Sequence, residues 1–157
     1  MKDHSLRTEP DVSETIRAFA DTVYKVALNQ MKSREEAEDV FQDVFCRYAF
    51  CKTEFKDHEH KKAWLIRVTL NCCRNRFASA WFRHTTGLSD DQPAGSMQES
   101  REVFDAVMRL PKKYRTVVHL FYYEDMSIRE IGQALGIKEN TIASQLDRAR
   151  ELLRKSL

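Results

Sequence analysis

Residues 127–150 read SIREIGQALGIKENTIASQLDRAR, and this stretch decides the fold of the C-terminal part of the chain. Apolar residues recur at helical spacing on both sides of Gly136. Because glycine readily adopts the left-handed conformation that ends a helix in a sharp turn, we expect Gly136 to separate two helices. Gly132 lies inside the first of them, where glycine costs about 1 kcal/mol relative to alanine. A close crossing of two helices would explain that cost.

The two predicted helices have the size and the tight connection of a helix-turn-helix unit. Ser127 and Glu130 have the spacing of a capping box, and we expect Asn140 or Thr141 to cap the second helix. The second helix offers polar side chains suited to base edges and phosphates in a major groove: Thr141, Ser144, Gln145 and Arg148. An ordinary helical hairpin would show the same periodicity, but the glycine turn and the capping signals favour DNA binding.

The rest of the chain also has a helical pattern, with no strand signal. Ser33, three residues before Glu36, is expected to begin the second helix, and Pro111 stands where a later one can begin. A charged stretch, residues 52–62, precedes the third helix. The apolar stripes of the first three helices are Ile16, Phe19, Val23, Val26 and Ala27; Ala37, Val40, Phe41, Val44, Phe45 and Tyr48; and Ala63, Ile66, Leu70, Cys73, Phe77 and Ala80.

Residues 83–100 lose this periodicity and contain Gly87, Pro93 and Gly95. We therefore predict an all-α fold of two small helical domains, residues 1–82 and 101–157, joined by a flexible linker. The C-terminal domain contains the helix-turn-helix.

The 157 residues are 42% hydrophobic and 32% charged, which is a globular composition, and the net charge is only +2. The charges alternate in blocks. Two blocks are basic: residues 56–84 hold 7 Lys/Arg and 2 Asp/Glu, and residues 109–157 hold 10 Lys/Arg and 6 Asp/Glu. Two blocks are acidic: residues 11–50 hold 5 Lys/Arg and 8 Asp/Glu, and residues 85–108 hold 1 Lys/Arg and 5 Asp/Glu. Solvated faces would give the same blocks, but alternation is also typical of a chain that meets nucleic acid on some faces and protein on others.

No apolar run has the length of a membrane span, and the N-terminus has no signal-peptide core, so we expect a cytoplasmic protein without membrane insertion. Its four cysteines, Cys46, Cys51, Cys72 and Cys73, form no C-x-x-C pair and are expected to be free thiols. His58 and His60 precede two of them, but zinc sites use paired ligands at fixed spacing, so we predict no metal and no cofactor. We find no catalytic constellation and do not expect an enzyme.

Three segments together resemble the extracytoplasmic-function (ECF) sigma factors of the sigma-70 family. Residues 110–154, LPKKYRTVVHLFYYEDMSIREIGQALGIKENTIASQLDRARELLR, are similar to the DNA-binding domain of that family. Residues 37–50, AEDVFQDVFCRYAF, resemble its polymerase-binding helix, and residues 63–83, AWLIRVTLNCCRNRFASAWFR, its promoter-melting helix. The resemblance implies a sigma factor that binds core RNA polymerase, reads the −10 and −35 promoter elements and helps to melt DNA.

By this resemblance, the largest subunit of polymerase would be contacted by Asp39, Gln42, Asp43 and Phe45. The −10 element would be held by Arg67, Asn71, Arg74 and Arg76, together with the loop before their helix, residues 56–62. Arginine can hold phosphate while asparagine reads a base edge. Trp64 and Trp81 are expected to be packed rather than stacked on bases, and Asn75 is assigned no role.

The −35 element would be read by Thr141, Ser144, Gln145 and Arg148. Relatives often carry cations where this chain has Ala143 and Gln145, so phosphate affinity should be lower here, while glutamine can still pair with adenine. In relatives the linker threads a channel of polymerase, where the acidic Asp90, Asp91 and Glu99 could mimic phosphates, but a disordered tether would have the same sequence pattern. Such relatives are often held by an anti-sigma factor, which is the third expected partner besides core polymerase and promoter DNA.

Two other interpretations stay open from the residues alone. One is a transcriptional regulator that uses the helix-turn-helix without polymerase. The other is a thiol-based or metal-binding switch that uses the cysteines and histidines.

Overall fold

The computed structural model describes residues 6–83 and 98–157 of the chain. They form helices and connecting turns with no strand among them, which confirms the predicted all-α fold. The chain divides into two compact units, Met1–Asp90 and Asp91–Leu157. The predicted linker, residues 83–100, lies mostly outside the described residues. At its edges, Arg83 still belongs to the preceding helix and residues 98–100 already belong to the following one.

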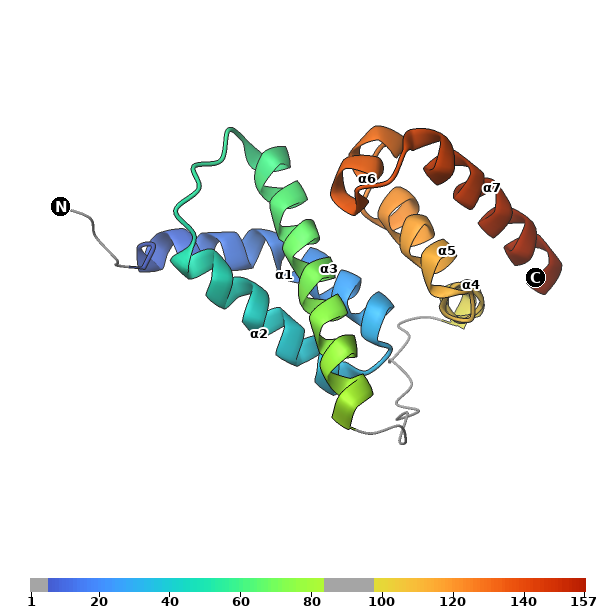
Figure 1. Ribbon diagram of the computed structural model, residues 1–157, viewed down its shortest axis with the longest axis horizontal. Helices are drawn as coiled ribbons and strands as arrows, with labels where there is room; N and C mark the ends of the chain where they lie inside the picture. Colours follow the sequence, from blue (N-terminus) through green and yellow to red (C-terminus); the bar gives the residue numbers. More distant parts are fainter. Residues whose placement is uncertain (1–5, 84–97) are drawn as a thin grey trace. The chain divides into compact units, whose positions relative to one another are not determined.

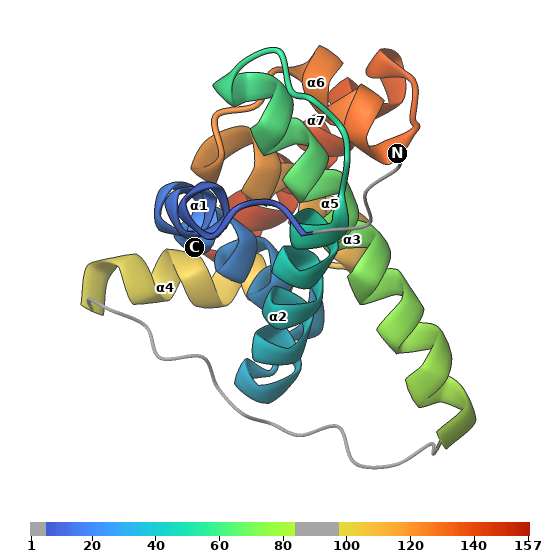
Figure 2. The same ribbon diagram turned by 90° about the vertical axis from the view of Figure 1, so that its left-hand side faces the viewer.

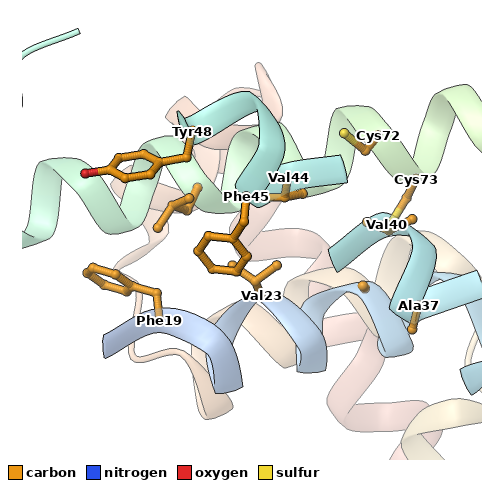
Figure 3. Close-up of a cluster of buried hydrophobic side chains, with 11 residues drawn as sticks. Phe19, Val23, Ala37, Val40, Val44, Phe45, Tyr48, Cys72 and Cys73 are labelled. Carbon is orange, nitrogen blue, oxygen red and sulfur yellow. The ribbon is translucent and has the colours of Figure 1, made fainter. Parts of the chain in front are cut away.

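The N-terminal unit consists of α1 (Glu9–Met31), α2 (Arg34–Phe50) and α3 (His58–Arg83), which pack against one another (Figure 1). Figure 3 shows side chains of all three helices meeting in its core. The stripes predicted for α1 and α2 are buried there apart from Ile16 and Phe41, which are half-buried. Burial at this spacing removes apolar surface from water and holds the bundle together.

Phe77 departs from the stripe predicted for α3, since 38% of it is exposed. In Figure 2 the last turns of α3 project away from α1 and α2, so the helix continues beyond the elements that would cover its apolar face. Ala80 and Trp81 lie outside the described side chains. Trp64 is half-buried against Tyr48 and Phe55, with ring centroids 6.1 and 5.6 Å apart, which confirms its predicted packing.

Side-chain caps fix where these helices begin. The Thr8 hydroxyl accepts a hydrogen bond from the Asp11 amide (3.3 Å), and the Ser33 hydroxyl accepts one from the Glu36 amide (3.2 Å). For α3, the Asp57 carboxylate accepts one from the His60 amide (2.8 Å). An aspartate cap is stabilising because it satisfies an orphan amide and complements the helix dipole. The prediction of a loop over residues 56–62 is therefore wrong for residues 58–62, because these residues form the first turn of α3.

The C-terminal unit contains α4 (Gln98–Met108), α5 (Lys112–Val118), the π-helical segment η1 (His119–Tyr123), α6 (Ile128–Leu135) and α7 (Glu139–Ser156). Pro111 is the N-cap of α5, so the helix begins one residue after the position predicted for its start. α7 packs against both α5 and α6 (Figure 1). The core of this unit is formed by buried apolar residues that include Val107, Leu110, Val118, Ile131, Ile142, Leu146 and Ala149.

The turn between α6 and α7 has the predicted glycine geometry. Gly136 is left-handed (φ 70°, ψ 34°), and the capping box closes with the Ser127 amide bonded to Glu130 Oε1 (2.8 Å) and the Glu130 amide bonded to Ser127 Oγ (3.1 Å). The predicted cap of α7 was wrong. Its N-cap is Lys138, whose carbonyl accepts the Ile142 amide (3.0 Å), because the chain leaves the turn extended at that residue and the helix begins at Glu139.

Gly132 is required by the turn rather than by a crossing of two helices. A Cβ atom at this position would lie 2.7 Å from the carbonyl oxygen of Ile137, closer than real Cβ contacts come. The Ile137 amide donates to the Gly132 carbonyl (3.0 Å), so the turn folds directly back onto the helix. The absence of a side chain at Gly132 therefore sets how closely α7 can follow α6.

Candidate protein and nucleic-acid interfaces

The outer face of α2 carries the residues predicted to bind polymerase. Asp39, Gln42 and Asp43 are all exposed there, and the two aspartates lie one helical turn apart. Such a face can meet a basic partner with little change in the helix.

Phe45 does not belong to that face. It is 5% exposed, its ring centroid lies 4.9 Å from that of Phe41, and Figure 3 shows it pointing toward α1 beside Val23. A buried ring in the core cannot form part of a contact surface, so we correct the predicted polymerase-binding set by removing Phe45.

Phe50 is the aromatic residue that α2 does expose, at 60%. Successive spacings of four, three and four residues separate Asp39, Asp43, Cys46 and Phe50. These residues and Gln42 therefore form one line along the helix. We call this line, Asp39, Gln42, Asp43, Cys46 and Phe50, the α2 ridge. The sequence analysis missed Phe50, although the same spacing that placed the aspartates together predicts its position.

The outer face of α3 carries three of the four residues predicted for the −10 element. Arg67, Asn71 and Arg74 are exposed at spacings of four and three, and Arg74 Nη1 lies 3.4 Å from Asn71 Oδ1. Asn75 is exposed beside them. Two guanidinium groups around one amide could hold a phosphate backbone while the amide contacts a base.

Arg76 is separate from this group. Its Nε donates to Glu36 Oε1 (2.7 Å) and its Nη2 donates to Asp39 Oδ2 (3.1 Å), so it binds α2 instead of facing solvent with the other arginines. The hydrogen bond to Glu36, with the charges of Asp39 and Asp43, raises the pKa of Arg76 above its usual value. One side chain therefore connects the predicted DNA-binding helix to the predicted polymerase-binding helix.

The segment before α3 is held by Arg7, which the sequence analysis did not select. The Arg7 amide donates to the Ala49 carbonyl (2.8 Å), its Nε donates to the Tyr48 carbonyl (3.1 Å), and its Nη2 donates to the Thr53 carbonyl. Its guanidinium lies 4.4 Å from the centre of the Tyr48 ring. A charged donor with several carbonyl acceptors fixes the chain where α2 ends and the loop starts.

Asp11 completes this arrangement from α1. It accepts hydrogen bonds from the Tyr48 hydroxyl (2.8 Å) and from Arg7 Nη1 (3.1 Å), and Lys61 Nζ lies 3.9 Å away. Although burial acts to raise it, these two hydrogen bonds and the Lys61 charge lower the pKa of Asp11. All three helices of the unit are thus joined at the base of the loop that precedes the −10 residues.

The outer face of α7 carries the residues predicted for the −35 element. Thr141, Ser144 and Arg148 are exposed within its first three turns. Gln145 is half-buried, and its Oε1 is buried without a hydrogen-bond partner. Bidentate pairing with adenine needs both the amide oxygen and the amide nitrogen, so Gln145 has to turn outward before it can form that pair.

Contacts with η1 hold α7 in place. Arg150 Nε donates to the Tyr122 hydroxyl (2.7 Å), and its Nη1 pairs with Asp147 (3.1 Å). The buried His119, the first residue of η1, lies 3.2 Å from the buried Glu124, which follows η1 as its C-cap, between Nε2 and Oε2. The Arg150–Tyr122 hydrogen bond thus joins α7, the predicted recognition helix, to η1.

The four cysteines are free thiols, as predicted. Cys46 is exposed, Cys51 is half-buried, and Cys72 and Cys73 are buried. Burial raises the pKa of Cys72. Burial also acts to raise that of Cys51, but hydrogen bonds from Thr53 and Arg7 outweigh it and lower the pKa.

Across the described part of the chain, no three His, Cys, Asp or Glu side chains are grouped so that they could hold a metal ion. Among the same residues, no helix combines the length and apolar character that crossing a membrane requires.

Two family models match the chain, and together they cover most of it. The model described as Sigma-70 region 2 matches residues 15–83, and the model described as Sigma-70, region 4 matches residues 100–153. Each of the two compact units thus contains one matched region.

Curated relatives agree over nearly the full length. The chain is 27% identical to the ECF RNA polymerase sigma factor SigW of Bacillus subtilis (strain 168), over 92% of this chain and 88% of that one. It is 29% identical to SigM of the same organism, over 91% and 93%.

Two solved structures share the fold. The sigma factor RpoE, in complex with the anti-sigma factor NepR from Bartonella quintana, matches with a TM-score of 0.75 at 16% identity, over 93% of this chain and 96% of that one. CnrH, in complex with the cytosolic domain of CnrY, matches with a TM-score of 0.67 at 21% identity, over 94% and 88%.

Proposed function

Because the chain belongs to the ECF group of the sigma-70 family, we propose that it binds core RNA polymerase in the cytoplasm and directs it to promoters with particular −10 and −35 elements. The observation that carries this proposal is the exposure of a predicted DNA-binding face in each unit, Arg67, Asn71 and Arg74 on α3 and Thr141, Ser144 and Arg148 on α7. The chain itself supplies recognition, and polymerase performs the chemistry.

Binding to polymerase uses the α2 ridge. Asp39 and Asp43 attract a basic surface, and Phe50 provides an apolar anchor on the same line. Exposed aromatic residues surrounded by polar ones are frequent hot spots of protein interfaces. Phe50→Ala should weaken core binding without unfolding the chain, whereas Phe45→Ala removes a core side chain and should cost about 3–5 kcal/mol of stability.

Recognition of the −10 element uses the outer face of α3. Arg67 and Arg74 hold phosphates, and Asn71 contacts a base that has left the duplex. The Arg7 contacts fix the loop before α3, so that this face and the loop are presented together to the unpaired strand.

Recognition of the −35 element uses α7 in a major groove. Ser144 and Gln145 contact base edges, and Arg148 holds a phosphate. Since α7 lacks cations at Ala143 and Gln145, phosphate neutralisation is modest, and the free chain should bind duplex DNA weakly at physiological salt.

An anti-sigma factor is the partner that we propose for regulation. The support is the match to RpoE, whose structure was solved with the anti-sigma factor NepR.

The experiment that tests the proposed function is run-off transcription with core polymerase on a library of promoters. We expect the chain to produce transcripts from a subset that shares −10 and −35 elements. If the chain neither binds core nor supports any transcript, but still binds duplex DNA with sequence preference, a regulator that acts without polymerase is the better description.

A further inference from the structure

Arg76 lies between the two interfaces of the N-terminal unit. Its two hydrogen bonds reach Glu36 at 2.7 Å and Asp39 at 3.1 Å, across 40 and 37 positions of sequence. The Arg76 side chain is 28% exposed, compared with 41% for Glu36 and 51% for Asp39, so the guanidinium is the inner member of the group.

The group has the geometry of a specific bridge. The planar guanidinium donates from Nε to Glu36 and from Nη2 to Asp39, so its fixed set of donors joins two carboxylates at once. Asp43 adds its charge from one turn further along α2. Arg76 thus neutralises part of the acidic face that the proposed function assigns to polymerase.

A basic partner that binds at Asp39 meets a carboxylate that already accepts a hydrogen bond from Arg76 Nη2 and whose charge Arg76 partly neutralises. We propose that the Glu36–Arg76–Asp39 bridge is an internal competitor, closed in the free chain and opened when core polymerase takes Asp39. Opening the bridge releases Arg76 on the helix that carries Arg67, Asn71 and Arg74. This inference rests on the proposed function, because it needs polymerase at the α2 ridge.

The effect has a limited size and a definite sign. Exposed ion pairs change an equilibrium by about two- to fivefold, so core binding should be weakened by that factor while the bridge is closed. Because coupling is reciprocal, core should raise the affinity of the same unit for single-stranded −10 DNA by a similar factor, and DNA should do the same for core.

The test compares the affinity of purified core polymerase for full-length variants, in competition with a labelled wild-type chain. Arg76→Ala should bind core about two- to fivefold more tightly than Arg74→Ala. Arg74→Ala is the matched control, because it removes one positive charge two residues away, from a side chain that bonds Asn71 and not α2. If Arg76 had only a structural role, Arg76→Ala would weaken the binding of core polymerase instead.

A double-mutant cycle with Asp39→Asn identifies the carboxylate. With Asp39→Asn present, Arg76→Ala should no longer strengthen core binding. If Arg76→Ala does not fold, Arg76→Gln keeps the stem of the side chain, removes the charge and should show the same gain.

The outcomes are distinct. If wild-type chain binds core and neither Arg76 variant binds more tightly than Arg74→Ala, the bridge is not a competitor and the inference is overturned alone. A gain that persists in the Asp39→Asn background also overturns it. If the wild-type chain does not bind core, the proposed function fails and the inference fails with it.

Discussion

The substitution Gly132→Ala tests how α7, the proposed recognition helix, is positioned. Helix propensity alone predicts that alanine stabilises α6 by about 1 kcal/mol relative to glycine. The added Cβ, however, would lie 2.7 Å from the Ile137 carbonyl oxygen, and this oxygen belongs to backbone that cannot rotate away. Overpacking of this kind costs about 1–3 kcal/mol. We therefore expect a net destabilisation of about 1 kcal/mol, opposite in sign to the propensity effect.

Amide hydrogen exchange in α6 and α7 of the full chain is the suitable assay, because both tryptophans, Trp64 and Trp81, lie in the N-terminal unit and do not report on this one. A loss of about 1 kcal/mol lowers protection about fivefold. The exposed neighbour Gln133 provides the control, since Gln133→Ala should change stability by no more than about 0.5 kcal/mol. Increased protection in Gly132→Ala would refute the close approach at Ile137.

Three further predictions concern the two predicted interface faces and Lys32, the C-cap of α1. The double variant Asp39→Lys and Asp43→Lys should stay folded and lose core binding through charge repulsion, and undiminished pull-down of polymerase would contradict the assignment of the α2 ridge. Gln145→Ala should relax preference at one −35 position by about 1–3 kcal/mol, whereas Arg148→Ala should weaken all promoters alike and lower the salt dependence; base-preference profiles at several salt concentrations distinguish them. Lys32 ends α1 with φ 59°, so Lys32→Gly should stabilise the N-terminal unit by about 0.5–1 kcal/mol in urea unfolding followed by tryptophan fluorescence.

Local patterns predicted much of the fold. Apolar spacing identified the buried faces of α1, α2 and α7, because each of these stripes meets another helix along most of its length. The capping box at Ser127 and the left-handed Gly136 were predictable because they depend on neighbours only a few residues away. The start of α3 was equally local, and Asp57, three residues before His60, was the signal that the sequence analysis passed over.

Features that depend on distant contacts were not predictable. Arg76 is an arginine like the predicted −10 arginines, but it stands two positions after Arg74, off their spacing of four and three. Its partners, Glu36 and Asp39, are far away in sequence, so its contacts could not be predicted. The carbonyl contact that requires Gly132 likewise exists only after the turn has formed.

The division of labour between the chain and polymerase is the central claim. Separating a duplex costs about 1.4 kcal/mol of stacking per base-pair step. In the proposed function, the face of Arg67, Asn71 and Arg74 would have no unpaired strand to hold until polymerase positions the DNA. We expect polymerase to supply further contacts and to set the spacing between the −10 and −35 sites.

Permanganate reactivity of promoter thymines, with and without core polymerase, measures this claim most directly. We predict no opening by the chain alone and clear opening at a matched promoter when core is added. Asn71→Ala should reduce that opening more than it reduces closed-complex binding. Strand opening by the free chain, or none with core on any promoter of a broad library, would contradict the account.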